Sequence, residues 1–74
     1  MKKKIFLGEN IKCLRKNNGL SIKDLSSKIN VPYSTLCCWE NGIRTPKLET
    51  IMEFVDFFGV SLTDIVSKDL SKEK

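Results

Sequence analysis

The 74-residue sequence contains no histidine, and its three cysteines (Cys13, Cys37 and Cys38) lack the Cys-x-x-Cys spacing of a zinc site. Histidine is a common catalytic base and, with cysteine, a common metal ligand. The sequence also has no glycine-rich phosphate-binding loop and no nucleophile–base pair. We therefore expect neither an enzyme nor a metal or other cofactor, and we interpret the cysteines as reduced thiols.

Long hydrophobic runs are absent as well, since the run at residues 5–7 is far too short to span a membrane. Lys2–Lys4 are typical of the start of a signal peptide, but the apolar stretch behind them ends at once, at Gly8–Asn10. The sequence therefore predicts a cytoplasmic protein. The alternation of apolar and polar residues that is typical of strands is nowhere sustained.

Positive charge is concentrated towards the start of the chain. Residues 1–47 carry ten basic groups and three acids, whereas residues 48–74 carry three basic groups and six acids, which leaves the whole chain at +4. This asymmetry suits a polyanionic partner on one face. A solvated charge pattern with no partner is the alternative, and charge alone does not decide between the two.

Apolar residues recur at helical spacing along the chain. The pattern predicts an all-α domain over residues 1–67, with helices at about 6–17, after Ser21, at 33–40, at 48–58 and after Ser61; residues 68–74 form a polar tail. The apolar residues that we expect to point inward are Leu7, Ile11, Leu14, Leu25, Ile29, Leu36, Trp39, Leu48, Ile51, Phe54, Val55, Phe58, Leu62, Ile65 and Val66.

Residues 21–42 predict two short helices joined by a tight turn. Ser21 and Asp24 have the spacing of a capping box, which starts the first of them. Asn30 tolerates the positive φ that a sharp turn needs. Pro32 forces the residue before it out of helical geometry and is itself preset for a first helical turn. Such a pair holds its second helix at an angle suited to the DNA major groove.

With these helices, the chain resembles the Cro/repressor-type helix-turn-helix proteins, also known as the xenobiotic-response-element family. The resemblance covers about Leu7 to Val66 and implies a compact five-helix domain. It is most specific at Trp39–Gly42, at Pro46 and at Gly59–Leu62. The other segments on which the resemblance rests are Asn10-Ile11-Lys12, Leu14-Arg15-Lys16, Gly19-Leu20-Ser21, Asp24-Leu25, Asn30-Val31 and Ser34-Thr35-Leu36.

The resemblance implies that the third helix is the recognition helix and that its base-contacting residues are Tyr33, Ser34 and Cys38, flanked by Thr35 and Cys37. The residue types agree, because burying Leu36 and Trp39 leaves these five on other faces. A serine hydroxyl can bond to several bases, and a tyrosine ring can pack on a thymine methyl, whereas Cys38 offers apolar contact. Packing of Tyr33 on its own helix is the alternative for that residue.

Phosphate contacts are implied at two places, the start of the second helix and the end of the recognition helix with its following loop. The residues there are Ser21, Ile22, Lys23, Asn41, Arg44 and Lys47. Arg15 and Glu40 stand where the family holds a partly buried ion pair. The forked guanidinium of Arg15 can hold both a carboxylate and a nearby phosphate.

Departures from the family limit what the resemblance says about the DNA sequence. Ile22 stands where many relatives have glutamine, and Pro32 replaces the usual hydroxyl cap of the recognition helix. With Cys37 and Cys38 where polar residues are common, the reading surface is poor in hydrogen-bonding groups. No operator sequence follows from it.

The predicted function is that of a sequence-specific regulator of transcription, a repressor that binds inverted half-sites of double-stranded DNA as a homodimer. Met52, Phe57 and the last helix are the candidates for the dimer surface, although Phe57 fits the core equally well. The alternative is an antitoxin or adaptor of the same fold that acts mainly through protein–protein binding. The electropositive first part of the chain argues against this alternative.

Overall fold

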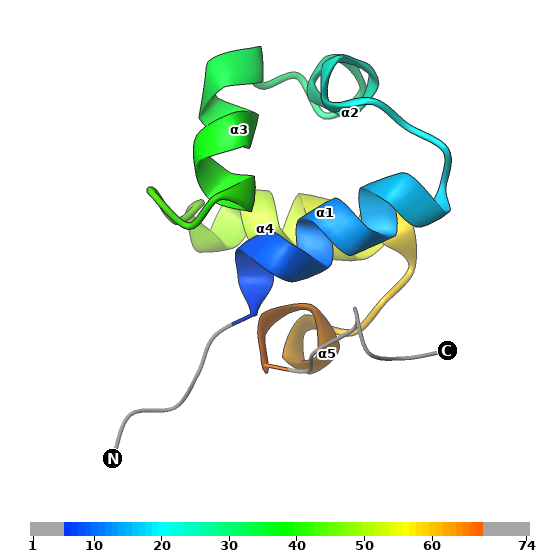
Figure 1. Cartoon of the computed structure of the whole chain (residues 1–74). Coiled ribbons are helices and arrows are strands. Elements are labelled where there is room, and N and C mark those ends of the chain that lie inside the picture. The colour runs from blue at the N-terminus through cyan, green and yellow to red at the C-terminus, as the bar shows by residue number, and fades with distance from the viewer. Residues whose placement is uncertain (1–5, 68–74) are drawn as a thin grey trace.

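A computed structural model describes residues 6–67, which form five helices and no strand (Figure 1). The predicted all-α fold, with its helix-turn-helix at the second and third helices, is confirmed. The predicted tail at residues 68–74 lies outside the described residues. The helices are α1 (Leu7–Asn17), α2 (Ile22–Lys28), α3 (Tyr33–Glu40), α4 (Leu48–Phe58) and α5 (Leu62–Ser67).

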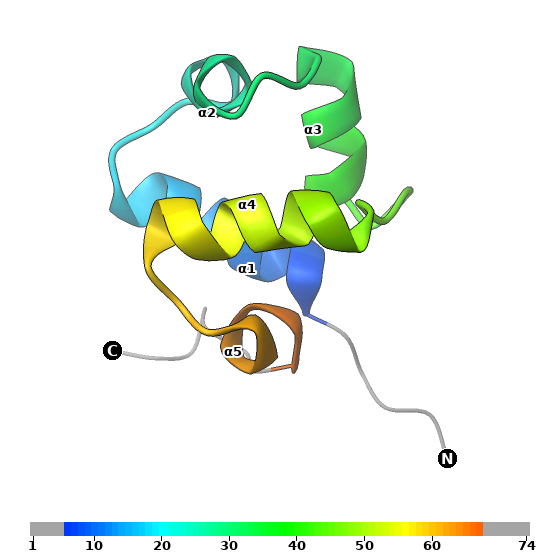
Figure 2. The same cartoon turned by 180° about the vertical axis from the view of Figure 1, so that it is seen from behind.

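The helices are arranged in three levels. In both Figure 1 and Figure 2, α2 and α3 lie at one end of the molecule and α5 at the other, with α1 and α4 between them. α1 packs against both α3 and α5, while α3 packs against α2 and α5 against α4. Each of the helices over residues 6–67 is too short, or too polar, to cross a bilayer.

Every helix contributes to a single hydrophobic core. The ring of Phe54, which is fully buried, meets Trp39 edge to face at 5.9 Å between ring centres and stacks on Phe58 at 6.2 Å. This aromatic contact fastens α3 to α4. The buried apolar residues are Leu7, Ile11, Leu25, Leu36, Trp39, Ile51, Phe54 and Ile65.

Two leucines that were expected in the core are exposed. Leu48 is 62% exposed and Leu62 is 38% exposed. Each is the first residue of its helix, α4 and α5 respectively. The prediction was wrong for both, because helical spacing gives the direction of a side chain but does not say whether a neighbouring element covers the first turn.

The capping box at the start of α2 and the positive φ of Asn30 after this helix form as the sequence predicts. The hydroxyl of Ser21 accepts the backbone N–H of Asp24 at 3.0 Å, and the N–H of Ser21 donates to the Asp24 carboxylate at 3.0 Å. Asn30 adopts φ +61°. Pro32 is the N-cap of α3 in extended geometry, so it precedes the first helical turn and does not form part of it. Local chemistry therefore sets where each of the two helices begins.

The first and last described helices are joined by hydrogen bonds to carbonyl groups of α5. The amide of Asn10, a fully buried residue of α1, donates to the carbonyl of Ile65 at 2.8 Å. The backbone N–H of Phe6 donates to the carbonyl of Val66 at 2.9 Å. Sequence reasoning gave Asn10 no role, because nothing near it in the chain indicates a partner 55 residues away.

Candidate nucleic-acid interface

α3 has a buried side and an accessible side. Leu36, Trp39 and Glu40 are buried. The accessible side carries the five residues that were predicted to contact bases: Tyr33 and Ser34 are exposed, and Thr35, Cys37 and Cys38 are half-buried. Ser34 and Cys38 lie four residues apart, and so one above the other at the middle of this side.

Tyr33 lies at the start of this accessible side. It is 55% exposed, so packing on its own helix covers less than half of the side chain. The other half is open to a partner.

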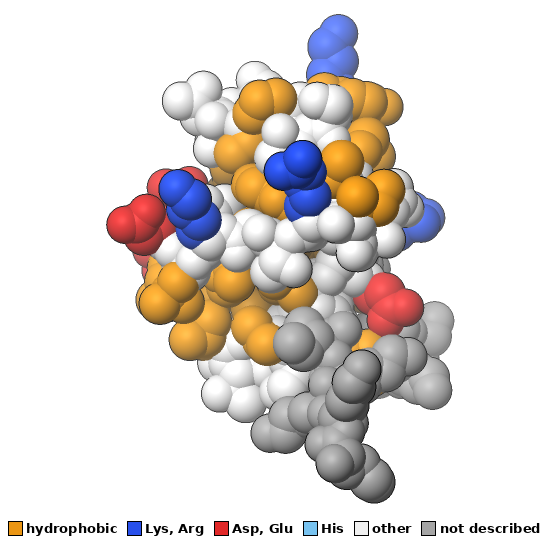
Figure 3. Space-filling view, turned by 90° about the vertical axis from the view of Figure 1, so that its left-hand side faces the viewer, with side chains coloured by type: hydrophobic (Ala, Val, Ile, Leu, Met, Phe, Trp, Pro, Cys, Tyr) orange, Lys and Arg blue, Asp and Glu red, His pale blue; other side chains and the backbone are white. Residues whose placement is uncertain are grey.

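An open groove runs along α3, between that helix and the loop that leads to α4. Ser34, Thr35 and Cys38 form the wall of the groove on α3. The loop and the start of α4 supply Arg44, Thr45, Pro46, Lys47 and Thr50. Figure 3 shows the side of the molecule that carries this loop, where separate Lys and Arg side chains lie among uncharged and hydrophobic ones, and one of them lies beside acidic side chains.

The loop after α3 turns back onto the end of that helix. The backbone N–H groups of Ile43 and Arg44 donate to the carbonyl of Cys38 at 2.9 and 3.4 Å. Pro46 is buried, whereas the cationic side chains of Arg44 and Lys47 are exposed. The fold of the loop therefore holds both cations at the edge of the groove.

The start of α2 is the second region where phosphate contacts were predicted. Ser21 and Lys23 are exposed there, but the side chain of Ile22 packs against the core. Because this half-buried side chain is apolar, the backbone N–H of Ile22 is the group that could bind a phosphate, so the phosphate contact of Ile22 stays a prediction. The N–H and hydroxyl of Ser21 hold the pKa of the Asp24 carboxyl below its ordinary value.

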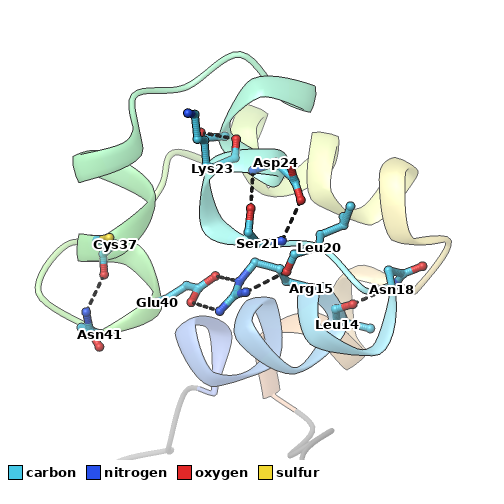
Figure 4. Close-up of polar contacts among 11 residues, drawn as sticks. Leu14, Arg15, Asn18, Leu20, Ser21, Lys23, Asp24, Cys37, Glu40 and Asn41 are labelled. Atoms are coloured by element: carbon cyan, nitrogen blue, oxygen red, sulfur yellow. Dashed lines mark hydrogen bonds and ion pairs between the residues drawn. The ribbon is translucent and has the colours of Figure 1, made fainter.

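Arg15 of α1 reaches across to the last turn of α3 (Figure 4). Its Nε lies 2.7 Å from Oε2 of Glu40 and its Nη2 lies 3.2 Å from Oε1. Its Nη1 donates to the carbonyl of Leu20 at 2.8 Å. One guanidinium thus joins α1, the turn after it and α3. Since its side chain is only 9% exposed, the phosphate contact of Arg15 stays a prediction.

Gly8 is a positioning residue that sequence reasoning missed. A Cβ at this position would collide with the carbonyl oxygen of Trp39 and lie 3.0 Å from that of Glu40. The missing side chain lets the first turn of α1 rest on the backbone at the end of α3. A glycine inside a helix, where it normally costs stability, was the available signal.

The cysteines carry no metal site in the described part of the chain. Cys13, Cys37 and Cys38 form no disulfide among the described residues. Residues 6–67 contain no group of three potential metal-ligating side chains of the His, Cys, Asp or Glu type.

These helices and this accessible face define a helix-turn-helix protein. The model of the family described as Helix-turn-helix matches residues 11–65. The chain therefore belongs to this family, in the Cro/repressor type that its sequence resembles.

Three known proteins illustrate the similarity. The cryptic phage CTXphi transcriptional repressor RstR of Vibrio cholerae is 33% identical over 57 residues, which are 77% of this chain and 51% of the relative. Antitoxin PezA of Streptococcus pneumoniae is 33% identical over 64 residues, 86% of this chain and 40% of the relative. The chain thus spans about half the length, or less, of these curated relatives.

The third is a solved structure, that of the biofilm master regulator SinR in complex with DNA. It has a TM-score of 0.72 and 28% sequence identity, and the match covers 80% of this chain and 95% of that one.

Proposed function

We propose that this protein is a sequence-specific regulator that represses transcription by binding double-stranded DNA with α3 in the major groove. The observation that carries the proposal is the accessible side of α3, bordered by the exposed cations Arg44 and Lys47. A helix of this kind presents side chains to base edges, while cations beside it neutralise phosphates. The similarity to a phage repressor and to a DNA-bound regulator supports it.

The protein acts in this proposal as a homodimer on inverted half-sites. One recognition helix contacts few bases, and a two-fold dimer doubles the number that are read, with half-sites about 34–36 Å apart. Exposed apolar side chains of α4 and α5 are available for the interface. They are Leu48, Met52, Phe57 and Leu62.

Selection of bound sites from random duplexes tests the proposal directly. The expected result is an enriched inverted repeat whose spacing gives the distance between the two recognition helices. A protein that enriches no sequence, and binds no duplex at low salt, is not a DNA-binding regulator.

Salt dependence then tests the phosphate contacts. When log K, the logarithm of the association constant for the duplex, is plotted against log[salt], it should fall with a slope of about 0.9 for each phosphate that the protein neutralises. Arg44→Ala and Lys47→Ala should each lower this slope by about one per bound protomer. Lys28→Ala, at the exposed end of α2, is the matched control and should leave the slope unchanged.

The second candidate function is that of an antitoxin or adaptor of the same fold, and the similarity to antitoxin PezA favours it. Its partner would be a protein and would need an apolar surface, for which the exposed Met52 and Phe57 are available. The two functions differ in the salt titration. Binding to no duplex at low salt, together with intact folding, favours the adaptor.

A further inference from the structure

The accessible side of α3 has an uncommon chemistry for a surface that reads bases. The helix over Tyr33–Glu40 contains no arginine, lysine, asparagine or glutamine. Its one charged side chain, Glu40, is buried and paired with Arg15. The amide of Asn41, the next residue, donates to the carbonyl of Cys37 at 2.9 Å. The side chains that usually identify a base by two hydrogen bonds are therefore absent from α3, and the amide N–H of the adjacent Asn41 is already hydrogen-bonded.

Base edges in the major groove differ in the hydrogen-bonding and apolar groups that they present to a protein. Guanine is read by two hydrogen bonds from arginine or lysine, and adenine by two from asparagine or glutamine. Thymine alone presents an apolar group there, its C5-methyl. The thiols of Cys37 and Cys38, the methyl of Thr35 and the ring of Tyr33 are apolar or weakly hydrogen-bonding. Of the base edges, they match the thymine methyl best.

Cys38 occupies the centre of this surface. It lies one turn after Ser34, on the side of the helix away from the buried Leu36, and it lines the groove next to α3. Its short side chain keeps the helix backbone close to any base edge. A guanine or cytosine edge against this thiol would lose hydrogen bonds to water without regaining them from the protein.

We infer that this protein reads its DNA chiefly through thymine C5-methyl groups, with Cys38 as the specificity-determining residue and Ser34 adding a hydrogen bond. The inference rests on the proposed function, since it concerns how a bound α3 recognises bases. Burying one methyl group changes affinity about fourfold. One methyl group in each half-site of a dimer therefore accounts for about a 16-fold tighter binding to a duplex with these methyl groups than to one without them.

The test replaces thymine by uracil in the duplex that random-site selection identifies. Uracil pairs as thymine does but lacks the methyl group. Uracil within the two half-sites should weaken binding about 16-fold, with an unchanged salt slope because the phosphates are the same. Uracil outside the half-sites is the control for altered duplex shape, and it should leave binding unchanged.

Variants assign the effect to one residue. Cys38→Ser should bind the thymine duplex less tightly than the parent protein and should lose most of its sensitivity to uracil. Cys13→Ser, which changes a half-buried thiol on α1, should behave as the parent protein on both duplexes. Thermal melting checks that both variants fold.

Two negative results have different meanings. Equal affinity for the thymine and uracil duplexes, or a Cys38→Ser variant as sensitive to uracil as the parent, would overturn the methyl readout and leave the proposed function standing. Failure to bind any duplex would overturn the proposed function itself, and the inference with it.

Discussion

The buried and accessible sides of α3 differ in what their residues do. On the buried side, Leu36 and Trp39 belong to the core, and Glu40 forms an ion pair with Arg15. On the accessible side, Ser34 and Cys38 line an open groove. The eight residues of this helix thus divide into a group that fixes where the helix stands and a group that is accessible to the proposed DNA partner. Stability and recognition should therefore respond to different substitutions.

The largest effect is expected on the buried side, for Glu40→Ala. The substitution leaves the guanidinium of Arg15 buried without its carboxylate, a change that costs about 3–5 kcal/mol in the free energy of unfolding. DNA binding should fall with it, because α3 loses its tie to α1. Urea unfolding and titration of the selected duplex measure the two losses.

Glu53→Ala is the matched control, since Glu53 is an exposed glutamate of α4. It should change stability by no more than about 0.5 kcal/mol. If Glu40→Ala proved as mild as this control, the ion pair would not be what holds α3 in place.

Gly8→Ala should have the next largest effect, through the backbone rather than through a charge. The new methyl group collides with the end of α3, and overpacking of this kind costs about 1–3 kcal/mol. An alanine inside a helix is otherwise more stable than glycine, so the sign of the change in melting temperature is decisive. Stabilisation would show that α1 does not rest closely on α3.

Ser34→Ala tests the accessible side and should separate binding from stability. Ser34 is exposed, so stability should stay within about 0.5 kcal/mol of the parent protein. Loss of one hydrogen bond to DNA should weaken binding roughly 2- to 12-fold for each half-site that the proposed dimer occupies. A comparable loss of stability would contradict the division of α3 into two sides.

The smallest effect is expected from the pH dependence of the capping box. Folding lowers the pKa of Asp24 from its ordinary 3.8, first through its hydrogen bond with the backbone N–H of Ser21. The ionised carboxylate therefore stabilises the start of α2 above about pH 4, and this contribution is lost as pH falls through the lowered pKa. The difference in melting temperature between the parent protein and Asp24→Asn should shrink on acidification. A difference that is constant with pH would show that the carboxylate charge has no part in the cap.

Much of the fold was predictable because its signals are local. The Ser21–Asp24 cap and the Asn30 turn lie within a few residues of the structure that they specify. Helical spacing also placed Ser34 and Cys38 opposite the core.

What was missed depends on segments that are far apart in the chain. The contact of Gly8 with α3, the bond from Asn10 to α5 and the exposure of Leu48 follow from packing between helices. Apart from the helical glycine at position 8, no pattern in the sequence near these residues indicates which residues they contact.

The bonds from Phe6 and Asn10 to the carbonyls of Val66 and Ile65 also bear on the order of folding. They join residues 55 or more positions apart, so they close only after nearly all of the described chain has been synthesised. α1 in turn supplies the contacts that orient α3. A nascent chain that ends before Ile65 lacks these bonds, so we expect its α1, and with it α3, to be held less firmly than in the complete fold.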